Sequence, residues 1–325
     1  MFDGLLDRDE ELRDRPRLAT GWVQYELAYL TLNPDHRIQG VETPGEFAKW
    51  ILQRLKKNRQ WLKNIQSVKI LPPRTLHRIL DLPVAEGKRP TAAGEDRAPP
   101  AKVDYTLQRP ARLRFKLKDI DQDFFEPIRS LLGDPYFARF PYSRLLRAAV
   151  PANQSLLKNQ YATLLPIEEH NPVIIFNLRQ GVRFHDGELF DAEDVLFTYR
   201  ALMDERNLSP RRADYEPVKT ARILGPHKIK FVYKRLFSPA IGAWSIGILP
   251  EHRLNREALR KEAQARGMTP EKIESFTLRD SEFNRKPVGT GPFRFVEWQS
   301  DEMIHLRRHD QYWEGPPEYA EYIMR

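Results

Sequence analysis

Hydrophobic residues recur at helical spacing in two segments of the chain, and each segment opens with a helix start signal. In the first segment, Thr43 predicts the N-cap, and Glu46 lies at the third helical position, where it completes a capping box. In the second segment, Asp191 and Asp194 have the same relation. The positions predicted to face the core are Phe47, Trp50, Ile51, Leu55, Val195, Tyr199, Leu202 and Met203. Both segments predict a strand, a turn and a capped helix, so an internal duplication and the shared chemistry of helix N-termini both remain open.

Other segments show the alternation or the continuous apolar runs of β-strands. Leu113, Phe115 and Leu117 alternate with basic residues, which predicts a half-buried strand of an antiparallel sheet. Its solvated face should carry Arg112, Arg114, Lys116 and Lys118. Further strands are predicted at 173–178, in a hairpin that turns at Gly225 and Pro226, and twice within 289–313. Helices are predicted within 53–64, 123–132 and 141–150 and in a segment that ends at Gly267.

Length and composition are those of a globular protein large enough for two domains, or for one domain with a large insertion. Of the 325 residues, 41% are hydrophobic and 30% are charged. The segment from Pro83 to Lys102 is rich in Pro, Gly, Ala and charge, which predicts a flexible loop. No apolar run reaches the roughly 20 residues that a membrane span needs. Acidic residues near the start stand where a signal peptide would carry a basic cap, so we expect no export signal within this sequence.

The net charge of +8 raises nucleic acid as a partner. The basic residues, however, are spread along the chain among nearly as many acids, and recognised nucleic-acid motifs are missing. We therefore expect no nucleic-acid partner and interpret the basic run 53–64 as the solvated face of a helix. Cysteine is absent, which excludes disulfides, thiolate metal sites and a cysteine nucleophile.

His185 and Asp186 are the residues that most resemble a catalytic pair. Adjacent strand residues point to opposite faces, so these two cannot form an oriented dyad unless a turn brings them together. Asp186 and Gly187 instead predict a plain turn. His305 and His309 would lie about 13 Å apart along a strand, too far to share a metal ion. The sequence shows neither a serine elbow nor a phosphate-binding loop, so we expect no enzyme activity, no metal site and no cofactor.

Two blocks of the sequence, taken together, resemble the family 5 extracellular solute-binding proteins of ABC transporters. This family includes periplasmic oligopeptide-, dipeptide- and nickel-binding proteins. The first block is "IIFNLRQGVRFHDGELFDAEDVLFTYRALMD", and the second begins at "PVGTGPFRFVEW". The residues that carry the resemblance are Arg179, Gly181, His185, Asp186, Gly187, Ala192, Asp194 and Val195 in the first block and Gly289, Thr290, Gly291, Pro292, Tyr312 and Trp313 in the second. Weaker similarity extends over "FDGLLDRDEELRDRPRLATGW" and "SPAIGAWSIGILPEHRL".

The resemblance implies an α/β (mixed α+β) fold, namely lobe I of a two-lobed, type II periplasmic-binding-protein architecture. Residues 1–22 would begin lobe I, residues 23–172 would form an inserted α+β region, and residues 173–325 would form the main part of lobe I. The second lobe is not expected within this chain. Because such receptors hold a ligand between two lobes, we expect residues 1–325 alone to bind solute weakly or not at all.

The resemblance also implies the substrate-binding component of an ABC-type importer, which captures peptides or another small polar solute. Such a protein works with transporter permease subunits, lies in the periplasm or another extracytoplasmic compartment, and is monomeric when complete. Phe2, Asp3, Gly4 and Trp244 are the candidates for the wall of the ligand cleft, with structural burial the favoured interpretation of Trp244. The alternative is a protein- or polyanion-interaction module built on the inserted basic region.

Overall fold

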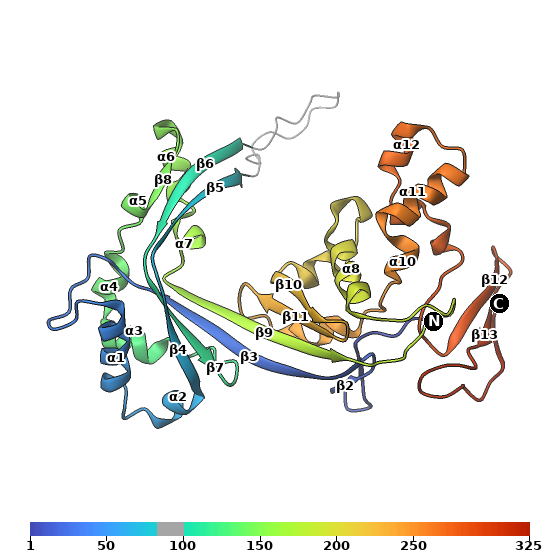
Figure 1. Ribbon diagram of the computed structural model, residues 1–325, viewed down its shortest axis with the longest axis horizontal. Coiled ribbons are helices and arrows are strands. Elements are labelled where there is room, and N and C mark those ends of the chain that lie inside the picture. The colour runs from blue at the N-terminus through green and yellow to red at the C-terminus, as the bar shows by residue number, and fades with distance from the viewer. Residues whose placement is uncertain (83–100) are drawn as a thin grey trace. The chain divides into compact units, whose positions relative to one another are not determined.

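The computed structural model describes residues 1–82 and 101–325, which form two compact units (Figure 1). Met1–Gln24 and Pro172–Arg325 make up one of them, called here the terminal unit, and Tyr25–Asn171 make up the other, the central unit. Strands β3 (Ala19–Thr31) and β9 (Glu168–Leu178) each contain residues of both units. Helices and sheets occur in both units, which confirms the mixed α/β class.

The terminal unit contains an antiparallel sheet in which β9 pairs with β11 and β11 pairs with β10. The hairpin between β10 and β11 turns at Gly225 and Pro226, as predicted. The elements of this unit are β1 (Leu6–Arg8), β2 (Asp14–Pro16), α8 (Ala192–Met203), α9 (Arg212–Tyr215), β10 (Val218–Gly225), β11 (Lys228–Tyr233), α10 (Glu251–Leu254), α11 (Arg256–Ala265), α12 (Pro270–Ser275), β12 (Phe293–Gln299), β13 (Met303–Arg308) and β14 (Glu321–Met324).

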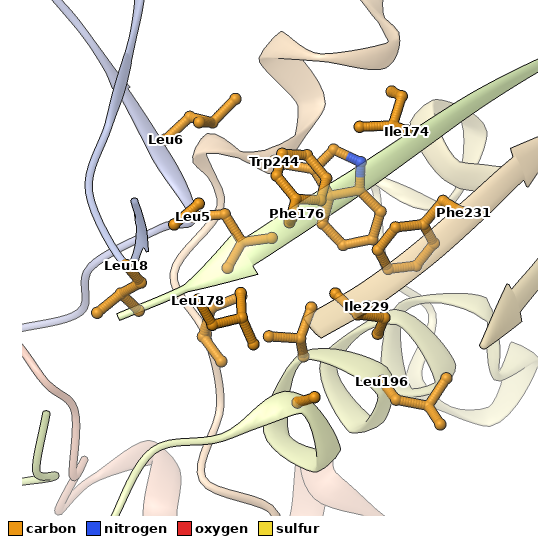
Figure 2. Close-up of a cluster of buried hydrophobic side chains, with 14 of the residues drawn as sticks. Leu5, Leu6, Leu18, Ile174, Phe176, Leu178, Leu196, Ile229, Phe231 and Trp244 are labelled. Atoms are coloured by element: carbon orange, nitrogen blue, oxygen red, sulfur yellow. The ribbon is translucent and has the colours of Figure 1, made fainter. Parts of the chain in front are cut away.

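The core of the terminal unit forms around the indole of Trp244, which is fully buried (Figure 2). The ring of Phe231 lies 4.0 Å from it between centroids, and the ring of Phe176 lies 5.8 Å from it. The register of β9 and β11 places Phe176 opposite Ile229, so both side chains enter this core. Trp244 Nε1 donates to the hydroxyl of Tyr233 at 3.1 Å, which satisfies the one polar group of the indole.

The described residues of the central unit contribute strands to two sheets and form two apolar clusters. In one sheet β7 pairs antiparallel with β3 and with β4, and in the other β6 pairs with β5 and with β8. Figure 1 shows β5, β6 and β8 side by side. The elements of this unit are α1 (Pro44–Arg54), α2 (Arg59–Asn64), β4 (Ile65–Leu71), β5 (Arg74–Leu82), β6 (Ala101–Arg109), β7 (Arg112–Leu117), α3 (Glu126–Leu132), α4 (Asp134–Ala138), α5 (Tyr142–Leu145), β8 (Leu146–Ala148), α6 (Gln154–Lys158) and α7 (Tyr161–Leu164).

The two predicted helix starts are confirmed. Thr43 caps α1 and Asp191 caps α8, and each helix has both hydrogen bonds of a capping box, with Glu46 and Asp194 as the respective partners. In α1, Phe47 and Ile51 are buried. These helices form where predicted because a cap is a short-range interaction, encoded within four residues of sequence.

Three predictions need correction, and a fourth lies mostly outside the described residues. The basic run 53–64 is interrupted, because α1 ends at Arg54 and α2 begins only at Arg59. Within 141–150, a single helical turn gives way to strand β8. Arg112 is buried rather than solvated, because its guanidinium pairs with the carboxylate of Glu169. The predicted loop at 83–102 falls mostly outside the described residues, and its last two positions begin β6.

Candidate solute-binding site of the terminal unit

The turn that carries His185 and Asp186 forms as predicted. The backbone N–H of Gly187 donates to the carbonyl of Phe184 at 2.9 Å, and Gly187 has a φ of +96°, which favours glycine. Beyond the turn, Asp186 Oδ2 lies 2.9 Å from His252 Nε2. His185 and Asp186 therefore contact different parts of the unit and do not form a dyad.

The ring of His185 joins the first signature block to the second. Its Nε2 lies 2.9 Å from the carbonyl oxygen of Gly291, and its Nδ1 lies 3.2 Å from the backbone nitrogen of Gly289. A carbonyl can only accept and an N–H can only donate, so the ring is neutral, with its proton on Nε2. Burial lowers the pKa of His185 to about 4, which agrees with this assignment. The ring therefore stays neutral near neutral pH and holds two turns together.

The N-terminal segment packs directly against the second block. The backbone N–H of Gly291 donates to the carbonyl of Met1 at 2.8 Å. A Cβ atom at Gly289 would lie 2.2 Å from the carbonyl oxygen of Met1, and one at Gly291 would lie 2.7 Å from its carbonyl carbon. Only glycine permits this approach of two backbones, which explains the glycines of the "GTG" turn.

Asp3 is the centre of a buried polar cluster that combines the N-terminal segment with the second block. Arg17 Nη2 and the Tyr312 hydroxyl donate to Oδ1 at 3.0 and 3.3 Å. Trp313 Nε1 and the Thr290 hydroxyl donate to Oδ2 at 3.0 and 3.4 Å. Each carboxylate oxygen thus receives two donors, which fills its acceptor capacity. The carboxylate of Asp3 has no position left for the amino group of a ligand, so we assign it a structural role.

Charges around this cluster reinforce it. Burial by itself would lower the pKa of Arg17, but the hydrogen bond to Asp3 and the neighbouring acidic groups outweigh burial, so this pKa is raised. Burial, followed by the charge of Asp3, raises the pKa of Tyr312. The guanidinium of Arg179 lies 4.2 Å from the centroid of the Trp313 ring, a cation–π contact between the two signature blocks.

The other ligand candidates differ in their surroundings. Trp244 is fully buried, as the favoured interpretation required, and its contacts are those of the core. Gly4 is buried against the backbone of Ser245. Phe2 is half-buried, and its ring lies 6.1 Å from that of Phe283. Of the four candidates, Phe2 retains the most accessible side chain.

A polar hollow of about 340 Å³ lies beside this region. Two of its lining residues connect it to the N-terminal segment and to the turn of the first block, because Phe283 contacts Phe2 and His252 contacts Asp186. Its volume falls within the range of small-molecule sites, roughly 300–1,000 Å³. Side chains of both charges surround it, and a zwitterion that binds there would exchange partners with the ion pairs Lys261–Glu257 and Lys286–Glu282. The lining residues are His252, Arg253, Ala258, Lys261, Glu262, Ser281, Glu282, Phe283 and Lys286.

Metal and membrane features are absent from the part of the chain that the structure describes. No group of three or more His, Asp or Glu side chains there is arranged to hold a metal ion. His309 follows β13 rather than lying on it, and its ring is 5.0 Å from that of His185. None of the helices within 1–82 and 101–325 has the length and apolar character of a membrane span.

The profile of the bacterial extracellular solute-binding proteins, family 5 Middle, matches residues 158–325, just over half of the chain. The chain therefore belongs to this family of solute-binding proteins. It is 32% identical over 145 residues to the oligopeptide-binding protein AppA of Bacillus subtilis (strain 168), which covers 43% of this chain and 23% of that relative. It is 26% identical over 211 residues to the di/tripeptide-binding protein 2 of Pseudomonas aeruginosa (strain UCBPP-PA14), which covers 59% of this chain and 37% of that relative.

Among solved structures, NikZ from Campylobacter jejuni in complex with Ni(L-His) is similar over 47% of this chain and 27% of its own length. The sequence identity is 29% and the TM-score is 0.40. The chain spans less than two fifths of the length of each of these three proteins. The family assignment rests on the sequence match, which includes both signature blocks.

Sequence reasoning missed three members of this region. Arg17, His252 and Phe283 belong to no recognised motif, and each joins the cluster or the hollow through a contact between distant parts of the chain. The segments "DRPRLATGW" and "ILPEHRL", which resemble the family weakly, contain Arg17 and His252. This weak similarity is the one feature of the sequence that could have indicated Arg17 and His252 as members of the region.

Proposed function

We propose that this chain supplies lobe I of the substrate-binding component of an ABC-type importer. The complete protein would capture peptides or another small polar solute outside the cytoplasm and deliver it to the permease subunits. Residues 1–24 and 172–325 would form lobe I proper, and the central unit would be an insertion into it. The bound solute would be chemically unchanged.

One observation carries this proposal. The N-terminal segment and the two signature blocks, distant in sequence, converge on Asp3 and His185, in a chain that belongs to the family 5 solute-binding proteins. The polar groups of this convergence satisfy one another, so they fix the backbone instead of performing chemistry. The adjoining hollow, with Phe283 and His252 at its edge, supplies both acidic and basic side chains. Such a lining suits a short peptide, which carries an amino group and a carboxylate.

The test is a titration of the full chain with trialanine and other short peptides, followed by NMR. We expect saturable shifts for resonances of His252 and Phe283, with an apparent Kd weaker than about 1 μM, the value that corresponds to about 8 kcal/mol. Mass spectrometry of the same samples should recover the peptide intact. Hydrolysis of the peptide at an enzymatic rate, or the absence of a shift in the terminal unit with every peptide, would refute the proposal.

A further inference from the structure

Two adjoining hollows lie in the central unit, far in sequence from the signature blocks. One has a volume of about 280 Å³ and the other of about 430 Å³. They share a wall formed by Pro34, Pro73 and Pro110. A single small molecule that reaches past this wall can therefore occupy both.

The smaller hollow has an apolar floor, while His36, Arg37 and Glu42 contribute polar groups to its lining. Leu32, Ile38 and Val41 line it and are only partly buried. Tyr136 lies behind them, fully buried, and its hydroxyl donates to the carbonyl of Thr31 at 3.2 Å. The side-chain amide of the remaining buried polar residue, Asn33, donates to the carbonyl of Tyr136 at 2.8 Å. Because these two buried polar groups are already paired, the floor of the hollow favours an apolar group.

The larger hollow is cationic. Arg74, Arg109 and Arg144 line it, and the register of β5 and β6 places Arg74 directly opposite Arg109. Within residues 1–82 and 101–325, neither of these two guanidinium groups has a hydrogen-bond or ion-pair partner, whereas Arg144 pairs with Asp35 at 2.6 Å. Like charges opposite each other across a sheet destabilise it.

The neighbourhood of Arg109 contains further positive charge. Burial, followed by the guanidinium groups of Arg112 and Arg74, lowers the pKa of Arg109. The carboxylate of Glu169 has the opposite effect on the pKa of Arg109 and raises it. Glu169, however, forms its ion pair with Arg112. A carboxylate that enters the hollow would relieve this repulsion and would accept paired hydrogen bonds from a planar guanidinium.

We propose that the central unit binds a small amphiphilic carboxylate, with its apolar group among Leu32, Ile38 and Val41 and its carboxylate between Arg74 and Arg109. This site is separate from the proposed solute site, because all its residues belong to the central unit. The shared proline wall sets the specificity: the carboxylate must lie a short distance from the apolar group, as in an arylalkanoic acid.

The experiment is a titration of the full chain with 3-phenylpropanoate, monitored through arginine Nε–Hε resonances in NMR spectra. 3-Phenylpropanamide has nearly the same shape without the charge, and acetate has the charge without the ring. We expect 3-phenylpropanoate to bind about tenfold more tightly than the amide, since a hydrogen bond to a charged group commonly contributes this much. It should also bind at least about tenfold more tightly than acetate, since acetate has no ring to bury. Equal binding of the amide, or no saturable shift at Arg74 and Arg109, would overturn the proposal.

Variants sharpen this test. Arg74→Gln and Arg109→Gln should each weaken 3-phenylpropanoate binding about tenfold. Arg222→Gln is the matched control, because Arg222 also lies on a strand opposite a cation, Lys230, but lines neither hollow. A loss of binding in the control equal to that in the other two would contradict the assigned site. Circular dichroism spectra should coincide for all variants, and trialanine should still shift His252 and Phe283, which separates this proposal from the proposed function.

Discussion

The charged groups at the centre of the signature cluster and those of the larger hollow in the central unit differ in how they are paired. In the terminal unit, the carboxylate of Asp3 receives four donors, two on each oxygen. In the central unit, Arg74 and Arg109 face each other without an acceptor among the described residues. A charged group whose hydrogen bonds are all made inside the protein holds the fold together. A charged group left without a partner in a hollow is available to a ligand.

This difference changes how the family signature is to be understood. The residues that identify the family, among them His185, Thr290 and Trp313, are engaged with each other and with the N-terminal segment. In our proposal they build the frame of the solute site and do not form its contact surface. The contact surface that we propose lies next to them, at His252 and Phe283.

The largest effect expected is on Asp3. Asp3→Ala leaves the buried guanidinium of Arg17 with a single charged partner, the exposed Glu314. Breaking a buried ion pair commonly costs about 3–5 kcal/mol, so we expect a loss of about 3 kcal/mol in the free energy of unfolding, measured in urea. Asp7→Ala removes an exposed carboxylate that is also paired with an arginine, Arg15, and should cost about 0.5 kcal/mol or less. Equal losses in both variants would show that Asp3 is not a structural centre.

The second effect depends on pH. Glutamine at position 185 can keep both hydrogen bonds of His185 but does not titrate. The folded-state pKa of His185 is about 4 and its ordinary value is 6.5, so between these values the unfolded chain binds the extra proton. The free energy of unfolding of the wild type therefore decreases as pH falls from 6.5 to about 4. His185→Gln lacks this contribution, because glutamine does not titrate.

The measurement for His185 is the difference in unfolding free energy between the two proteins at pH 7 and at pH 4. Relative to the wild type, the free energy of unfolding of the variant should rise by up to about 3 kcal/mol between pH 7 and pH 4. This is the equivalent of the pKa difference between the folded and unfolded states. Asp194 does not disturb the comparison, since burial raises its pKa to about 6 in both proteins. Parallel stability curves would contradict a neutral, buried His185.

A third pair of variants compares the helix starts of the two units. Thr43→Ala in α1 and Asp191→Ala in α8 each remove the side-chain acceptor of a capping box. Each should lower the free energy of unfolding by about 1 kcal/mol. Thermal unfolding followed by circular dichroism is sufficient to measure this, with Glu257→Ala as an exposed control in α11. A loss in only one of the two helices would mean that the caps are not equivalent.

The smallest expected effect has the opposite sign. Arg74→Glu converts the repulsive pair with Arg109 into an attractive one, so the free energy of unfolding should rise by about 0.5 kcal/mol. The same variant should lose 3-phenylpropanoate binding, because the new carboxylate occupies the place of the ligand. A destabilised variant that still binds the compound would argue against both statements.

Local chemistry accounts for what the sequence predicted well. Both capping boxes, the hairpin at Gly225 and the turn at Gly187 depend on residues within about four positions of one another, and all form as expected. The prediction failed for Arg112, which alternation placed on a solvated face, because its partner Glu169 comes from another strand. The resemblance located the signature residues of the candidate site, but the donors on Asp3 and the pairing of Arg74 with Arg109 required the tertiary structure.

The central claim is that the terminal unit receives the solute and that its signature residues form a frame. Parallel NMR titrations of the full chain with trialanine and with 3-phenylpropanoate test it most directly. We expect trialanine to shift resonances of His252 and Phe283 and to be recovered intact, while 3-phenylpropanoate shifts those of Arg74 and Arg109. Trialanine shifts confined to residues of the central unit, or cleavage of the peptide, would contradict the account.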